Sequence, residues 1–268
     1  MLVQYARLNP TGNMTAIVTN SVPRAEQPRV AARLMARGCD FAEQVGFLEA
    51  AALPGARVRL QMMGGEFCGN ASMSTAALLA LKDGLADGAE AVCPLEVSGA
   101  EGLVNCRIRR EGESFLGTVE MPLPEEISEA ELFSGTPFPL VRFPGIVHAI
   151  LPEDALSPEE AQTRIPALCA ALNADAMGIL LTDREFTRMR PLVYVRATDS
   201  AVWERGCGSG TAALGACAAA KRGRDAELAV RQSGGTIRVR ATWRDGGVRR
   251  IEISGRVVLE ETGTAEIL

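Results

Sequence analysis

Two cysteines, Cys68 and Cys207, are the residues in this sequence that are best suited to chemistry. Cys68 lies in the stretch EFCGN at residues 66–70, and Cys207 lies in the stretch ERGCGSGT at residues 204–211. An alanine-rich segment follows each stretch, at residues 71–82 and 212–221. We therefore expect each cysteine to stand at the start of a helix, one in either half of the chain.

A cysteine at a helix start is placed for proton transfer. The first N–H groups of a helix have no partner within the helix, and the helix dipole is positive at that end. Both effects favour the thiolate, so they lower the thiol pKa from its free value of about 8.5. The same N–H groups can hold a carboxylate, and a glycine after the cysteine lets a ligand approach the backbone closely.

A pair of such cysteines fits a reaction that inverts a carbon centre. Inversion removes a proton from one face and delivers another to the opposite face, which requires one base and one acid of intermediate pKa. The carbanion formed in between needs electrostatic stabilisation, which convergent N–H groups from Gly69, Asn70, Gly208 and Ser209 would supply. The pattern therefore indicates a racemase or epimerase with its site in the cleft between the halves.

Composition and charge exclude several classes of protein. The 268-residue chain is 47% apolar and 23% charged, its net charge is −5, and its basic residues are dispersed, which argues against a nucleic-acid partner. No apolar run reaches the length of about 18 residues typical of a membrane helix. The N-terminal residues lack the layout of a signal peptide. We expect a cytoplasmic protein with no membrane partner.

Residue usage also argues against a cofactor or a metal. The seven cysteines form no Cys-x-x-Cys pair and His148 is the single histidine, so a zinc site is not expected. The two lysines, Lys82 and Lys221, fall at the C-terminal ends of the expected helices, where neither suits a pyridoxal phosphate Schiff base. No nucleotide-binding glycine motif is present. The other cysteines, which are Cys39, Cys93, Cys106, Cys169 and Cys217, are expected to be buried apolar groups.

The pattern of short apolar runs and turn residues predicts an α+β fold. In the first half, strands are expected at residues 2–8, 14–19, 44–49, 58–63, 95–98, 103–109 and 118–121, with a helix at 28–37. In the second half, strands are expected at 146–151, 178–182, 191–196, 228–232, 236–243, 248–254 and 257–260. A capped helix starts at Ser157 and runs toward residue 172, with an interruption at Pro166 left open.

This order of elements occurs twice, which predicts two pseudo-symmetric domains. Both cysteine helices lack a polar stripe, as helices buried on all sides do, so each domain is expected to be a curved sheet or barrel around one central helix. The glutamate-rich residues 125–131 are the expected linker, giving domains at 1–125 and 126–268. The last strand crossing back to the first domain is left open, as is a single α+β domain with accidental internal similarity.

The motifs resemble those of the diaminopimelate epimerase family, whose members racemise amino acids without pyridoxal phosphate. The resemblance covers nearly the whole chain and is carried by Gly12-Asn13, Cys68-Gly69-Asn70, Glu204-Arg205 and Cys207-Gly208-Ser209-Gly210. It implies a pseudo-twofold fold of two domains, with one cysteine from each as the acid and base. It also implies that Asn13, Asn70 and the amides of Gly208 and Ser209 hold the amino-acid head of the substrate.

One departure from the pattern of this family narrows the choice of substrate. Classical diaminopimelate epimerases have several residues between the Glu-Arg pair and the second cysteine, whereas only Gly206 stands there in this chain. The chain is more similar to the histidine racemases of staphylopine-type metallophore biosynthesis, in the stretches NPTGNMT at 9–15, EQVGF at 43–47, EFCGNASMS at 66–74 and WE before CGSGT at 203–211. That resemblance implies interconversion of L-histidine and D-histidine.

The predicted site combines the two cysteines with a set of substrate contacts. The set is Asn13, Glu43, Gly69, Asn70, His148, Glu204, Arg205, Gly208 and Ser209. Glu204 would bind the substrate ammonium or an imidazole, with a surface acid as the alternative. Glu43 would play the mirrored role, with an acid that has no such role as the alternative. Arg205 could be merely solvated. His148 follows an apolar strand and is either a core histidine or a group that polarises a thiol.

Other functions remain open at this point. Another epimerase of the family, including diaminopimelate epimerase itself, is one alternative, and an isomerase of the proline racemase or phenazine-biosynthesis type is another. Phenazine-type relatives lack the cysteine pair and rely on an acid near Glu43, which disfavours that branch. A non-catalytic amino-acid-binding protein would not need two thiols at helix starts. The expected partner is a small amino acid, and a homodimer is left open.

Overall fold

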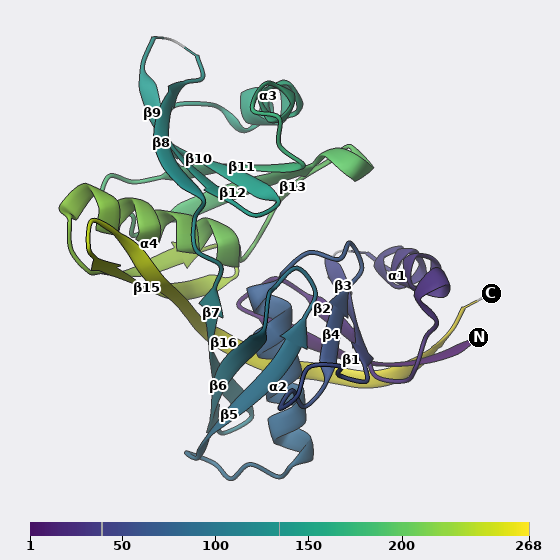
Figure 1. The fold of residues 1–268 in the computed structure, drawn as a ribbon. Coiled ribbons are helices and arrows are strands. Elements are labelled where there is room, and N and C mark those ends of the chain that lie inside the picture. The colour runs from purple at the N-terminus through teal and green to yellow at the C-terminus, as the bar shows by residue number, and fades with distance from the viewer. Residues whose placement is uncertain (39, 134, 268) are drawn as a thin grey trace. The chain divides into compact units, whose positions relative to one another are not determined.

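A computed structural model describes residues 1–38, 40–133 and 135–267 of the chain. Contacts divide the chain into two compact units, one made of Met1–Glu120 with Ser254–Leu268 and the other of Met121–Ile253. Within the described residues the strands form two sheets, so the protein has a mixed α and β fold (Figure 1). The helices of these segments are too short or too polar to cross a bilayer.

The first unit is a sheet with one helix buried against it. Its elements are β1 Leu2–Pro10, β2 Thr15–Val18, the 3-10 turn η1 Arg24–Glu26, α1 Gln27–Met35, β3 Gln44–Glu49, β4 Arg59–Met62, α2 Gly69–Lys82, β5 Glu90–Val97, β6 Leu103–Glu111 and β7 Ser114–Met121. The strands lie in the order β1 to β7, with parallel pairs at β2–β3 and β4–β5 and antiparallel pairs elsewhere. Helix α2 contacts β1, β2, β5 and β6.

The second unit contains a six-stranded sheet and two helices. Its elements are β8 Glu126–Glu131, β9 Pro137–Phe143, β10 Ile146–Pro152, α3 Pro158–Ala171, β11 Ala176–Thr182, β12 Met189–Val195, the 3-10 turn η2 Arg196–Thr198, β13 Ser200–Trp203, α4 Gly208–Arg222, β14 Ala226–Gln232 and β15 Gly235–Arg244. Strand β16 Gly247–Glu266 begins in this unit and ends in the first, where it pairs with β1. The strands of the six-stranded sheet lie in the order β13-β12-β11-β10-β9-β8.

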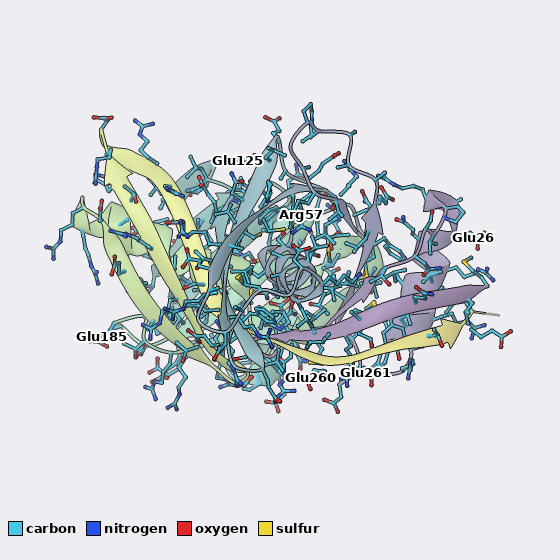
Figure 2. The ribbon with its side chains drawn as sticks, turned by 90° about the horizontal axis from the view of Figure 1, so that it is seen from below. Glu26, Arg57, Glu125, Glu185, Glu260 and Glu261 are labelled. Atoms are coloured by element: carbon cyan, nitrogen blue, oxygen red, sulfur yellow. The ribbon has the colours of Figure 1, made fainter. Side chains whose placement is uncertain are left out.

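The two alanine-rich helices are buried because their side chains are small. Residues 69–80 of α2 are all buried, and within residues 208–219 of α4 every residue except Ser209 is buried. Neither helix has a polar stripe, so other parts of the protein pack against every side of it. By contrast, charged side chains such as Glu185 and Glu260 point away from the ribbon (Figure 2).

The helices α1 and α3 cover sheet faces in the usual amphipathic way. Val30 and Leu34 of α1 pack with Val45 and Phe47 of β3. Ile165 and Cys169 of α3 belong to a core cluster with residues of β10 and β11. Ser157 caps α3, as its sequence predicts, and Glu160 completes a capping box.

Several sequence expectations are wrong in detail. The glutamate-rich residues 125–131, expected as a linker, contain strand β8, which pairs antiparallel with β9. Helix α3 continues through Pro166, and the strands expected at 248–254 and 257–260 are one strand, β16. The expected burial of Cys93, Cys106, Cys169 and Cys217 is confirmed, while Cys39 lies outside the described residues.

A close helix–strand approach makes one glycine in α4 sensitive to substitution. A Cβ atom on Gly215 would lie 2.5 Å from Cγ2 of Val239, which is buried on β15. The branched valine cannot yield without disturbing the core, so Gly215→Ala is expected to cost about 1–3 kcal/mol of unfolding free energy.

Thermal or denaturant unfolding measures this effect, and Gly247→Ala is the matched control because a Cβ atom there meets open space. Equal stability of the two variants would contradict close packing of α4 on β15.

Candidate active site

Each predicted catalytic cysteine is the N-cap residue of a buried helix. Cys68 has extended backbone geometry before α2, and its Sγ accepts the N–H of Ala71 at 3.4 Å. Cys207 stands in the same way before α4, and its Sγ accepts the N–H of Gly210 at 3.3 Å. The prediction that both thiols lie at helix starts is confirmed, and both sulfurs take the acceptor position that serine or aspartate usually fills.

A hydrogen-bonded cluster surrounds Cys68. The thiol donates to Oε1 of Gln44 at 3.2 Å, and Nε2 of Gln44 donates to Oδ1 of Asn13 at 2.6 Å. Asn70 donates to the same Oδ1 at 3.1 Å, and Nδ2 of Asn13 donates to the carboxylate of Glu43 at 2.8 Å. The first unit thus brings together four residues that the sequence singled out, and it adds Gln44.

The surroundings of Cys207 are different. Its backbone N–H donates to Oε1 of Gln232 at 2.7 Å, and Nε2 of Gln232 donates to Thr211 at 2.9 Å. The expected lowering of the thiol pKa is wrong for Cys207: burial raises this pKa well above its ordinary value, and the neighbouring Glu204 carboxylate raises it further. The hydroxyl of Ser209, 3.5 Å from the sulfur, and the N–H of Gly210 oppose that rise.

Packing explains the glycine at position 210, in the first turn of α4. A Cβ atom there would lie 2.9 Å from Leu180 and 3.2 Å from the Cys207 sulfur. The first turn of α4 therefore packs closely against Leu180 of β11 at this glycine. Arg205 is exposed, and its carbonyl accepts the N–H of Gly234 at 2.7 Å.

Comparison with known proteins identifies the family. The model of the histidine racemase CntK N-terminal domain matches residues 2–266. A histidine racemase of Fusobacterium nucleatum subsp. nucleatum is 34% identical over 224 residues, covering 80% of each chain, and one of Staphylococcus aureus is 30% identical over 280 aligned positions, covering 99% of this chain and 98% of the relative. The chain belongs to the histidine racemase family. It is therefore an isomerase of the amino acid racemase class.

Solved structures of distant relatives show the same fold. A hydroxyproline epimerase from Agrobacterium vitis has a TM-score of 0.70 at 16% identity, covering 98% of this chain and 92% of that one. A putative phenazine biosynthesis protein from Clostridium difficile has a TM-score of 0.62 at 14% identity, covering 99% and 100%. At such identities the likeness concerns the fold of the racemase alone.

Two residues close to the cysteines were not predicted from the sequence. Gln44 comes directly after Glu43 at the start of β3, and Gln232 is the last residue of β14. Both are amides at the end of a strand, beside a helix N-terminus that needs partners. That position was the available signal, but a strand-end glutamine is also a common surface residue, so the signal alone is weak.

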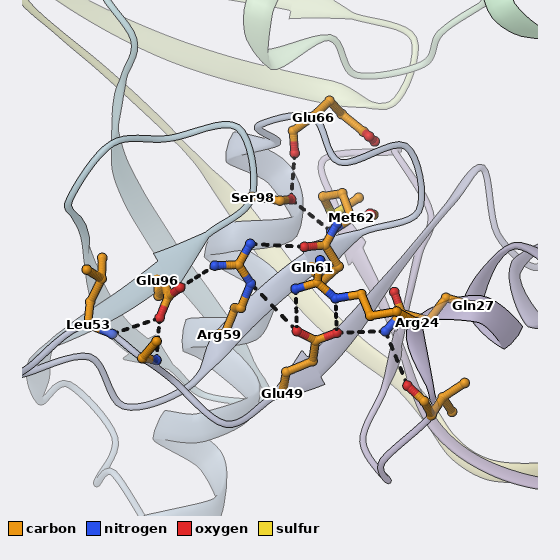
Figure 3. Close-up of polar contacts among 12 residues, drawn as sticks. Arg24, Gln27, Glu49, Leu53, Arg59, Gln61, Met62, Glu66, Glu96 and Ser98 are labelled. Carbon is orange, nitrogen blue, oxygen red and sulfur yellow. Dashed lines mark hydrogen bonds and ion pairs between the residues drawn. The ribbon is translucent and has the colours of Figure 1, made fainter.

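The loop before Cys68 is fixed by the end of β5. The hydroxyl of Ser98, which is buried, donates to the carbonyl of Glu66 at 2.8 Å and accepts the N–H of Met62 at 2.9 Å (Figure 3). A Cβ atom on the next residue, Gly99, would lie 2.3 Å from the backbone nitrogen of Phe67. The loop that leads to Cys68 therefore packs directly on Ser98 and Gly99.

A chain of charged groups lies beside Ser98. Arg59 pairs with Glu96, whose carboxylate also accepts the N–H groups of Ala52 and Leu53, and Arg59 donates to Gln61 at 3.1 Å (Figure 3). Burial raises the pKa of Glu66, whose side chain lies at the edge of the same group. These contacts hold β4 and β5 in register where the loop begins.

Removing the Ser98 hydroxyl is expected to disturb the racemase through Cys68. Ser98→Ala removes the partner of the Glu66 carbonyl and of the buried Met62 N–H, which costs about 1–3 kcal/mol of stability, and it frees the loop, so turnover should fall as well. Activity and unfolding assays measure both effects.

The matched control is Ser21→Ala, an exposed position in the same unit. A Ser98→Ala variant with turnover equal to that of Ser21→Ala would show that the Ser98 hydroxyl does not position the Cys68 thiol.

His148 packs as a neutral core residue. It is fully buried on β10, where its ring lies edge-on to Phe143 at 6.3 Å between centroids, and a Cβ atom on Gly178 would lie 2.1 Å from its Nδ1. Within the described residues, neither ring nitrogen has a hydrogen-bond partner. Burial lowers the pKa of His148 to about 3. Of its two sequence-based interpretations, this environment favours the core histidine.

The buried neutral ring should make the racemase sensitive to acid. The unfolded chain binds a proton at His148 below about pH 6.5 and the folded one only near pH 3, so stability falls as the pH drops through this window. His148→Leu is expected to remove about 2 kcal/mol of the stability loss between pH 7 and pH 5. Denaturant titrations at the two pH values measure it, and an unchanged pH dependence would contradict a neutral buried ring.

Proposed function

We propose that this racemase interconverts L-histidine and D-histidine through two bases, Cys68 and Cys207, without a cofactor. The observation that carries the proposal is the N-cap position of both thiols. Each sulfur accepts a first-turn N–H of a buried alanine-rich helix, and each has a second polar group within hydrogen-bond reach. A thiol can give a proton and a thiolate can take one, so one group of each kind on either side of the α-carbon would suffice for inversion.

The proposed reaction transfers one proton at a time. One thiolate takes the α-proton of the amino acid, and the electron pair stays on the α-carbon and its carboxylate. The other thiol then delivers its proton to the opposite face, which leaves the mirror-image amino acid and the two sulfurs with exchanged protonation. The reverse reaction uses the same groups in exchanged roles.

The first-turn N–H groups are proposed to bind the carboxylate of the substrate. Those of Gly69, Asn70, Gly208 and Ser209 belong to the helix ends where backbone donors have no intrahelical partner. An anion held there is stabilised more as charge develops on it, so the same contact favours the carbanion. Lys82 and Lys221 lie in the last turns of α2 and α4, away from these ends, in keeping with chemistry that uses no Schiff base.

Histidine is proposed as the substrate because the relatives that match most of the chain are histidine racemases. Two acids suit a substrate that carries an ammonium group and an imidazole. Glu204 lies beside the Cys207 thiol, and Glu43 lies in the cluster around Cys68. The two units, each with one cysteine-capped helix, are proposed to be the pseudo-symmetric domains of the enzyme.

Replacing either cysteine tests the two-base mechanism. Cys68→Ser and Cys207→Ser are each expected to lower racemisation of histidine by at least about 100-fold, because a serine hydroxyl is too weak an acid to replace a positioned thiol. Optical rotation measures turnover, and deuterium from solvent measures proton exchange at the α-carbon.

Cys169→Ser is the matched control, since Cys169 is a buried core thiol on α3 that donates to the carbonyl of Ala174. Full activity of either catalytic-site variant would overturn the mechanism. In the same assay, a panel of histidine, proline, hydroxyproline and diaminopimelate tests the substrate. Exchange with histidine alone supports the proposal, and exchange with another member of the panel but not with histidine refutes it.

A further inference from the structure

We infer that Gln44 is a positioning residue that holds the proton on Cys68 and directs its S–H bond. The inference rests on the proposed two-base function, because it concerns the state in which one of the two bases waits for substrate. Its observation is the contact between the Cys68 sulfur and Oε1 of Gln44 at 3.2 Å. The other contacts of Gln44 decide which end of its amide faces the thiol.

The nitrogen end of the Gln44 amide is held on the side away from the sulfur. Nε2 donates both to Oδ1 of Asn13 at 2.6 Å and to Oγ1 of Thr15 at 2.8 Å. The Thr15 hydroxyl itself donates to the Asn13 carbonyl at 2.9 Å, so its lone pairs are directed to the incoming N–H. With both amide hydrogens engaged, the oxygen is the end that remains for Cys68.

The orientation of Asn13 is fixed in turn by a charge. Its Nδ2 donates to the Glu43 carboxylate at 2.8 Å, and a carboxylate accepts hydrogen bonds but donates none. Turning the Asn13 amide over would set two oxygens against each other there. Asn70 also donates to Oδ1 of Asn13 at 3.1 Å. Glu43 thus orients Asn13, and Asn13 orients Gln44.

An amide oxygen facing a thiol favours the protonated form. It can accept the S–H hydrogen, but it offers no hydrogen to a thiolate and repels the negative charge. The helix end acts in the opposite direction, because the N–H of Ala71 points at the same sulfur from 3.4 Å. Gln44 and the helix end therefore act in opposite directions on the protonation of Cys68.

The charged groups on the neighbouring elements do not replace this role. The carboxylate of Glu43, on the segment before β3, reaches the thiol through Asn13 and Gln44. Glu66, in the loop before α2, is an acid whose pKa is raised by desolvation, and it has no hydrogen bond to the Cys68 sulfur among the contacts described here. Gln44 accepts the thiol hydrogen, so its hydrogen bond to the sulfur depends directly on the protonation of Cys68.

The contrast with the second unit supplies a control. Gln232 has the same amide group and a similar place beside a cysteine helix, but its oxygen accepts the backbone N–H of Cys207 and its nitrogen donates to Thr211. It therefore fixes the backbone of the cap. Substitution of Gln232 should leave the thiol chemistry of Cys68 unchanged.

The rate of Cys68 alkylation by iodoacetamide as a function of pH tests the inference, with mass spectrometry to identify the modified residue. The Cys207→Ser background removes the second thiol, so the measurement does not depend on turnover. In Gln44→Met the profile should shift to lower pH, with alkylation at pH 7 about fivefold faster, because the acceptor of the thiol hydrogen is lost. In Gln44→Glu it should shift to higher pH, because a carboxylate beside the sulfur disfavours the thiolate.

A merely structural role of Gln44 would not shift the alkylation profiles of Gln44→Met and Gln44→Glu in opposite directions. Thr15→Val, which removes one of the two acceptors that orient Gln44, should shift the profile in the direction of Gln44→Met but by less. Circular dichroism verifies that each variant is folded, and Thr15→Val carries the test if a Gln44 variant is not. Unshifted profiles, shifts of the same sign in both Gln44 variants, or an equal shift in Gln232→Met would overturn the inference. If Cys68→Ser keeps full activity while the shifts occur, the two-base function fails and the role of Gln44 stands.

Discussion

The unpaired N–H groups at the start of a buried helix are the constraint on which this structure depends. Helices α2 and α4 are buried almost throughout their first three turns, so their free donors cannot rely on water. In both helices the cap acceptor is a sulfur at 3.3–3.4 Å. A thiol is a weak acceptor, and a serine or aspartate would satisfy these donors better. A weak cap leaves the helix end able to bind another anion, which a strong cap would exclude.

The two thiols have unlike surroundings although they occupy like positions. The partner of Cys68 is a neutral amide oxygen, whereas Cys207 is fully buried beside the Glu204 carboxylate. The two proposed bases therefore differ both in burial and in the charge of the group beside the sulfur.

The sequence predicted the helix starts well because their cause is local. Glycines beside a cysteine and a following run of alanines are enough to indicate a cap and a buried helix, and Ser157 with its capping box is equally local. The errors concern features that distant residues decide. Residues 125–131 look like a charged linker, yet β8 forms because β9 offers a partner edge. Strand β16 is continuous because it lies between β7 and β15 in its sheet and pairs with the whole of β1 from Val257 onward.

The residues that contact the two cysteines and the loop before Cys68 could not be predicted from the sequence for the same reason. Gln44 and Gln232 differ from ordinary surface glutamines only by what lies across from them, and no spacing in the chain records that Asn13 and Thr15 would take both hydrogens of the Gln44 amide. Ser98 is separated from Cys68 by the whole of α2 and β5, yet it fixes the loop that carries the thiol. Candidate catalytic groups can be recognised in a sequence by residue type, because few side chains can do their chemistry. The groups that set their pKa and direction are common residues, and only the fold distinguishes them.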